Sequence, residues 1–124
     1  MASVPRIGAI ASGDRPDCLL WIRETVMVVE YIRYKVPSTD AQTFEKDYAT
    51  AGDILGMSEH CLSYELSRCV DEPGSYVVRI EWDSIDGHMQ GFRHSDVFQR
   101  FFAVIRPYVN QIEEMRHYEP LSAH

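Results

Sequence analysis

The sequence predicts an α+β fold of the ferredoxin-like kind, a four-stranded antiparallel sheet with both helices on one face. Four segments are rich in β-branched and aromatic residues, and two others carry apolar residues at helical spacing. Their order along the chain is β-α-β-β-α-β, which is the split βαβ arrangement. The length of 124 residues suits one such domain. We therefore predict an N-terminal extension (1–23), the domain itself (24–121) and a short tail (122–124).

The first half of the domain is predicted to contain a strand and a helix. Residues Val26 to Val36 are mostly β-branched or aromatic and stop at Pro37, which is typical of a strand and its end. Thr39-x-x-Gln42 is a capping-box pattern, and Gly56 is a typical helix stop. The helix between them would bury Phe44, Tyr48, Ala51 and Leu55.

The second half is predicted to supply three strands and one interrupted helix. The turn sequence Asp71-Glu72-Pro73-Gly74 separates two alternating segments, which indicates an antiparallel hairpin. Ser84 and Ser95 are both placed as helix N-caps, and Pro107 is expected to end the helix. The predicted strands are Cys61 to Cys69, Tyr76 to Trp82 and Glu113 to Glu119, and the apolar stripe of the helix is Ile85, His88, Met89, Phe92, Phe98, Phe101, Phe102 and Ile105.

Composition excludes several classes of function. The longest apolar run, Phe101 to Ile105, is far shorter than the ~20 residues that span a bilayer. The formal charge of -7 disfavours binding to nucleic acid or to an anionic membrane. The sequence has three cysteines without zinc-site spacing, Cys18, Cys61 and Cys69, so we expect no metal. They cannot all pair within one chain, which favours a reduced, cytoplasmic protein. The N-terminal apolar stretch is too short to predict an export signal.

The two faces of the predicted sheet differ in character. Alternation places the apolar strand residues on the helix side. The other face mixes charges of both signs with Val29, Tyr31, Val77 and Tyr118. This mixture is typical of a partly wet interface, which predicts a homodimer formed by two facing sheets.

The segment from Arg79 to Phe102 resembles the antibiotic biosynthesis monooxygenase family of dimeric α+β barrels. Its most specific parts are Glu81-x-Asp83-Ser84 and Ser95-x-x-Phe98, and the resemblance extends over residues 26 to about 119. It implies a homodimer with a pocket between the sheet and helices of each protomer. It also implies oxidation of a small anthrone- or quinol-like aromatic molecule by molecular oxygen, with no metal, flavin or other cofactor.

Two departures from the family pattern bear on this function. Many members carry a histidine where Phe92 stands. In the haem-degrading branch, an asparagine, a tryptophan and an iron-ligating histidine occupy the places of Tyr31, Trp82 and Phe102. Because phenylalanine cannot ligate iron, that branch is disfavoured. The alternative from another class is a non-catalytic module that binds a small ligand or a partner on the same barrel.

The candidate site residues lie on the helix side of the sheet. Trp82 could hold a substrate oxygen through its indole N–H, and His88 or His117 could act as a base near neutral pH. Glu30 is a carboxyl on an apolar strand face, so burial would raise its pKa and make it a base, unless it pairs with His117 or lies at a wet edge. Each could instead be a packing residue. The remaining candidates for substrate contact are Tyr34, Tyr64 and Phe92. We expect His60 and His94 at the surface. We expect cross-strand ion pairs among Arg33, Glu65, Arg79 and Glu81.

Overall fold

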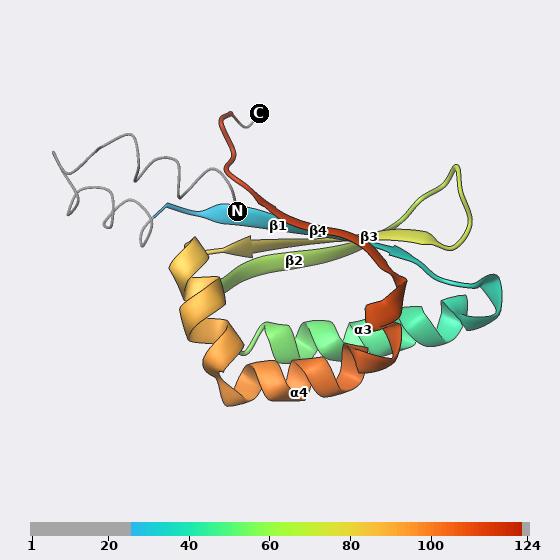
Figure 1. Cartoon of the computed structure of the whole chain (residues 1–124), viewed down its shortest axis with the longest axis horizontal. Helices are drawn as coiled ribbons and strands as arrows, with labels where there is room; N and C mark the ends of the chain where they lie inside the picture. Colours follow the sequence, from blue (N-terminus) through green and yellow to red (C-terminus); the bar gives the residue numbers. More distant parts are fainter. Residues whose placement is uncertain (1–25, 123–124) are drawn as a thin grey trace, which may run out of the picture.

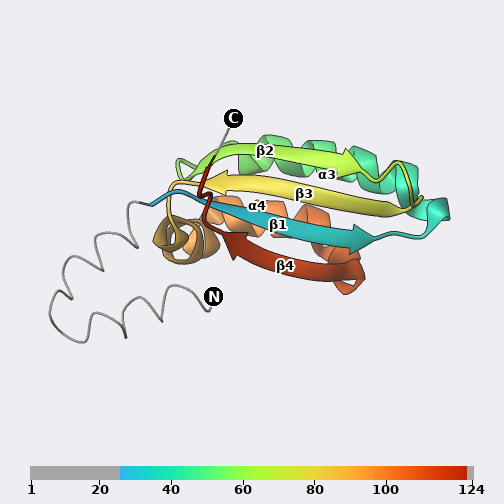
Figure 2. The same ribbon diagram turned by 90° about the horizontal axis from the view of Figure 1, so that it is seen from above.

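The computed structural model describes residues 26–122 as one layer of strands covered by helices (Figure 1). The predicted N-terminal extension, with Cys18, lies outside the described residues. The sheet order is β2-β3-β1-β4 with antiparallel neighbours, and both long helices cover the same face (Figure 2). This confirms the ferredoxin-like α+β fold. The elements are β1 (Val28–Lys35), α3 (Ala41–Leu55), β2 (Cys61–Arg68), β3 (Ser75–Trp82), α4 (Asp96–Ile105) and β4 (Ile112–Tyr118).

The core lies between the sheet and the two helices, as the periodicity predicts. Strand β3 alternates strictly between buried and half-buried residues. Helix α3 buries its predicted stripe against an aromatic cluster, in which the ring centroids of Tyr34 and Phe44 are 5.0 Å apart. The hydroxyl groups of Tyr34 and Tyr48 hydrogen-bond to each other at 2.8 Å, so both phenols have a partner inside the core.

The helix ends differ from the predictions. The capping box at Thr39 is wrong, because a 3-10 turn, η1 (Ser38–Asp40), precedes α3 and its backbone supplies the first bond, from Asp40 N–H to the Pro37 carbonyl. Gly56 does end α3, but in a right-handed conformation with φ of -66°. Pro107 does not stop the second helical segment, which continues as the 3-10 turn η4 (Arg106–Gln111), where proline falls in the first turn and loses no hydrogen bond.

The segment between β3 and α4 is the least regular part of the fold. Ser84 accepts a hydrogen bond from Gly87 N–H at 2.8 Å, as its predicted capping role requires. The chain then forms a π-helical turn, η2 (Gly87–Gly91), and a 3-10 turn, η3 (Phe92–His94). Ser95 caps α4 by accepting from Phe98 N–H. Single π turns of this kind occur frequently at functional sites.

The face of the sheet away from the helices is polar and aromatic. Arg79 pairs with Glu81 on its own strand at 2.7 Å, and Arg33 pairs with Glu114 of β4 at 3.1 Å. The rings of Tyr31 and Tyr118 meet edge to face with centroids 5.4 Å apart.

Among residues 26–122, no helix has the length and hydropathy needed to cross a bilayer.

Candidate functional site

A cavity of about 200 Å³ lies between the sheet and the helical segments that follow β3. Its polar lining comes chiefly from Glu30, His88 and Arg93, at an otherwise apolar surface. Aromatic walls with a few polar groups are the usual composition of a small-molecule site. The aromatic lining residues are Tyr34, Trp82, Phe92, Phe98, Phe101 and Phe102.

Glu30 is the most unusual of these groups. The alternation of β1 points it toward the helices, where it is 2% exposed. Trp82 donates its indole N–H to Glu30 Oε1 at 3.0 Å. Burial raises the pKa of Glu30 to about 7, although the Trp82 hydrogen bond and the charge of Arg93 both act to lower it. The carboxyl therefore changes its charge near neutral pH.

The hydrogen bond to Glu30 changes the role expected of Trp82. The sequence suggested that its indole N–H could hold a substrate oxygen, but in the structure Glu30 already accepts that hydrogen bond. An indole has a single polar hydrogen to donate. Trp82 is thus placed to orient the acid.

His88 lies on η2 with its ring stacked against Trp82, and 2% of the residue is exposed. Its Nδ1 atom lies 2.7 Å from Nε2 of His117, and its Nε2 atom lies 3.6 Å from Glu30 Oε1. Burial and the neighbouring charges of His117 and Arg93 lower the pKa of His88 to about 3. At neutral pH His88 is therefore an uncharged imidazole.

His117 completes this group from β4, the strand on the other side of β1 from β3. The register pairs His117 with Glu30 across β1 and β4, as one of the sequence alternatives required, but its side-chain hydrogen bond goes to His88. Burial and the charge of Arg93 lower the pKa of His117, although its side chain is only half-buried.

Glu30, His88 and His117 are also residue types that bind metals. Within the described part of the chain they are the one group of three or more such residues whose ligand atoms all lie within 4.8 Å of one another. His88, however, presents opposite ring nitrogens to its two neighbours, whereas a metal ligand offers one nitrogen to the ion. The 2.7 Å separation between the histidines is also shorter than the ~3.4 Å between two nitrogens bound tetrahedrally to an ion at ~2.1 Å. The two histidines thus share a hydrogen bond, and Glu30 lies 3.6 Å from the far ring nitrogen of His88.

Of the other candidate residues, two line the cavity and one does not. Tyr34 and Phe92 line the cavity, with the Tyr34 hydroxyl bonded to Tyr48. Tyr64 does not line it, because β2 is the edge strand under α3 and the Tyr64 ring lies against Gly52 of that helix. A hypothetical Cβ on Gly52 would come within 2.5 Å of the ring.

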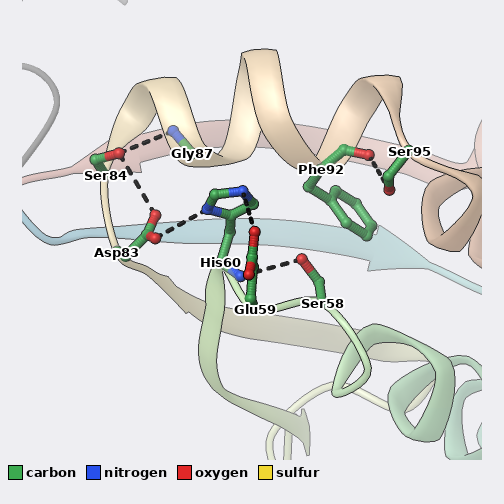
Figure 3. A network of polar contacts seen from close by, with 8 residues as sticks. All are labelled: Ser58, Glu59, His60, Asp83, Ser84, Gly87, Phe92 and Ser95. Carbon is green, nitrogen blue, oxygen red and sulfur yellow. Dashed lines mark hydrogen bonds and ion pairs between the residues drawn. The ribbon is translucent and has the colours of Figure 1, made fainter.

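His60 was expected at the surface, and the structure places it only partly there, with 28% of its side chain exposed. Its imidazole lies beneath the η2 turn (Figure 3) and its Nδ1 is 2.9 Å from Asp83 Oδ2. A Cβ added at Gly91 would be 2.4 Å from its Nε2, and one at Gly87 would be 2.9 Å from its Nδ1. Two glycines four residues apart on one helical face were the signal for this close contact. His60 therefore supports the turn that carries His88.

The fold and the site together define a class of small α+β proteins that enclose an aromatic cavity between one sheet and its helices. A family model for antibiotic biosynthesis monooxygenase matches residues 27–104, and the chain belongs to this family. Among curated proteins, the uncharacterized YczJ of Bacillus subtilis (strain 168) is 26% identical over 78 residues, which are 63% of this chain and 82% of YczJ.

Solved structures show the same fold. A Bordetella bronchiseptica protein that carries the family's name aligns with a TM-score of 0.66 and 23% identity, over 79% of this chain and 100% of that one. A mutant of SnoaB, a cofactor-independent oxygenase from Streptomyces nogalater, aligns with a TM-score of 0.63 and 18% identity, over 78% of this chain and 95% of SnoaB.

Proposed function

We propose that this protein is a cofactor-independent monooxygenase that oxidises a small anthrone- or quinol-like aromatic molecule with molecular oxygen. The observation that carries the proposal is the buried carboxyl of Glu30 in the wall of an aromatic cavity. Membership of the monooxygenase family and the likeness of fold to SnoaB support it. The cavity of about 200 Å³ is small beside the ~300–1,000 Å³ of common ligand sites, which favours a compact substrate.

The reaction needs a base and a dry pocket. For an anthrone-like substrate, removal of a proton from the activated CH₂ group gives a carbanion that can pass an electron to oxygen. The balanced change is CH₂ + O₂ → C=O + H₂O, in which the substrate supplies all four electrons and no external reductant is required. A carboxyl whose pKa lies near the working pH is well suited to take and return such a proton. Apolar walls keep water from the anion.

Each residue then has a separate role in the proposal. Glu30 is the base, and Trp82 holds it in place through the 3.0 Å hydrogen bond. Tyr34 and Phe92 form aromatic walls for the substrate ring. We also propose that two protomers associate through their open sheet faces, as the family resemblance implies.

The second candidate function is binding without catalysis. Two observations favour it: the Tyr34 hydroxyl and the Trp82 N–H are both bonded within the protein, and Phe92 stands where many family members have histidine. Such a site could hold an aromatic ligand without offering it a donor.

Oxygen uptake with a panel of anthrones, quinols and simple phenols separates these functions. The oxygenase predicts uptake on at least one compound, and Glu30→Gln should lower its kcat about a hundredfold or more. Glu113→Gln, which changes an exposed glutamate of β4, is the matched control and should retain full activity. Tight binding of a panel compound without oxygen uptake would overturn the oxygenase in favour of the binding module.

A further inference from the structure

We propose that His88 and His117 form a proton path that connects Glu30, in the cavity wall, with solvent at β4. This inference rests on the proposed role of Glu30 as the base. The observation behind it is a linear series of contacts, from Glu30 Oε1 to His88 Nε2 at 3.6 Å and from His88 Nδ1 to His117 Nε2 at 2.7 Å.

The burial along this series changes in one direction. Glu30 and His88 are each 2% exposed, whereas His117 is half-buried on the edge strand β4. Trp82 cannot take a proton from Glu30, because its indole nitrogen only donates. A substrate in the apolar cavity would displace the water that could otherwise exchange protons with the acid. Within residues 26–122, His88 then provides the remaining contact through which the acid can lose a proton.

The two imidazoles can carry the proton without becoming charged. When Glu30 is ionised, His88 Nε2–H faces the carboxylate and His117 Nε2–H donates to His88 Nδ1. When Glu30 is protonated, its O–H faces His88 Nε2, His88 Nδ1–H donates to His117 Nε2, and His117 carries its proton on Nδ1. Passage between these states moves one proton across each contact and one between His117 Nδ1 and water. Both histidines are neutral in each state, which agrees with the direction in which burial moves their pKa values.

The longest contact fits this scheme. At 3.6 Å the Glu30 to His88 distance exceeds a hydrogen bond, so a proton crosses this contact only when the two groups come closer together. Catalytic hydrogen bonds are often long in ligand-free sites and shorten during reaction. Among the described residues, the other groups that interact with Glu30 are Trp82 from β3, Arg93 from η3, Tyr34 from its own strand and Tyr48 from α3. None of them takes up a proton at neutral pH.

The benefit to the reaction is a base that recovers its ionised form in a closed site. With a pKa near 7, a sizeable fraction of Glu30 is protonated at neutral pH and cannot accept a substrate proton. The path lets that fraction discharge after the substrate has entered. His117 is therefore a proton-transfer residue that touches no substrate.

The first test needs no substrate. Because the Trp82 indole N–H is bonded to Glu30, its NMR resonance reports the ionisation of the acid, and Trp21→Phe removes the other indole of the chain. In this background we expect a single averaged resonance through the titration. His117→Ala should slow the exchange at least tenfold and separate two resonances, whereas His94→Ala, at an exposed histidine, should not. An averaged resonance in folded His117→Ala and in the volume-conserving His117→Gln would overturn the path.

The second test uses turnover on a substrate found in the oxygen-uptake panel. His117→Ala should lower kcat with little change in KM, and added imidazole should restore part of kcat by carrying the proton from His88. Absence of rescue together with an unchanged kcat would contradict the inference. The NMR result stands alone, so failure of the oxygenase proposal and failure of the path are distinguishable.

Discussion

The imidazole of His88 lies flat on the indole of Trp82, with ring centroids 4.1 Å apart and planes 7° from parallel. The same indole donates its N–H to Glu30. One side chain at the end of β3 thus fixes the positions of both an acid and an imidazole that come from different elements. Restraint of reacting groups by well-packed neighbours is what precise chemistry requires.

Glu30→Gln should make the protein more stable at alkaline pH. The pKa of Glu30 rises from 4.5 in the unfolded chain to about 7 in the fold, so the folded state binds the proton more tightly. Stability from this group is therefore present at low pH and is lost as pH rises from about 4.5 through 7. The advantage of Glu30→Gln in unfolding free energy should grow by about 2–3 kcal/mol between about pH 5 and pH 8.

Urea unfolding at both pH values measures this difference. His88 acts in the opposite sense, because its lowered pKa removes stability as pH falls from 6.5 toward about 3. That contribution is present in both proteins and largely cancels in the comparison. A constant difference between variant and parent at the two pH values would show that Glu30 ionises freely in the fold.

Trp82→Phe should shift the pH profile of turnover. Loss of the indole N–H removes a hydrogen bond that lowers the pKa of Glu30, so the acid should ionise at higher pH. The acidic limb of kcat/KM, which requires ionised Glu30, is expected to move upward in pH. A purely structural role for Trp82 would lower the melting temperature and leave this limb in place.

Gly91→Ala should destabilise the fold through His60. The added Cβ would come within 2.4 Å of His60 Nε2, and the ring is held by Asp83. The steric clash should cost about 1–3 kcal/mol of unfolding free energy. Alanine gains only ~1 kcal/mol over glycine in a helix, so we expect a net loss of stability. In a double-mutant cycle, His60→Ala should remove most of this loss. Net stabilisation by Gly91→Ala alone would argue against the close contact.

The protein is expected to sediment as a homodimer at micromolar concentration. On the open face of the sheet, Arg79 contacts Glu81 at 2.7 Å and the Tyr31 hydroxyl at 3.4 Å. Charge reversal by Arg79→Glu should therefore weaken the dimer more than Arg15→Glu, at a position outside the described residues. Sedimentation of the parent protein as a monomer would contradict the expectation.

Purified protein should be colourless and free of stoichiometric metal. The reason is that His88 presents one ring nitrogen to His117 in a 2.7 Å hydrogen bond and the other ring nitrogen to Glu30 at 3.6 Å. Elemental analysis and a haem titration measure this directly. One equivalent of transition metal lost in Glu30→Gln, or a Soret band dependent on His88 or His117, would show that the group is a metal site.

The sequence alone determined the fold and the side of the sheet that the candidate site residues face. A period of two in the strands placed Glu30, Trp82 and His117 on the helix side, and a period of 3.6 placed His88 and Phe92 toward them, because burying apolar side chains is the main driving force for each element. The helix boundaries were less predictable, since backbone hydrogen bonds of the 3-10 turns replaced the expected cap at Thr39 and carried the chain past Pro107.

Only the tertiary structure decided which of those side chains meet. The sequence could not show that the Trp82 N–H bonds to Glu30, that His88 lies next to both Glu30 and His117, or that Tyr64 lies under α3 away from the cavity. Periodicity defines a face but not a position along it or across neighbouring strands. Those positions depend on strand order, on register and on the π turn at Gly87–Gly91, which are set by contacts between residues distant in the chain.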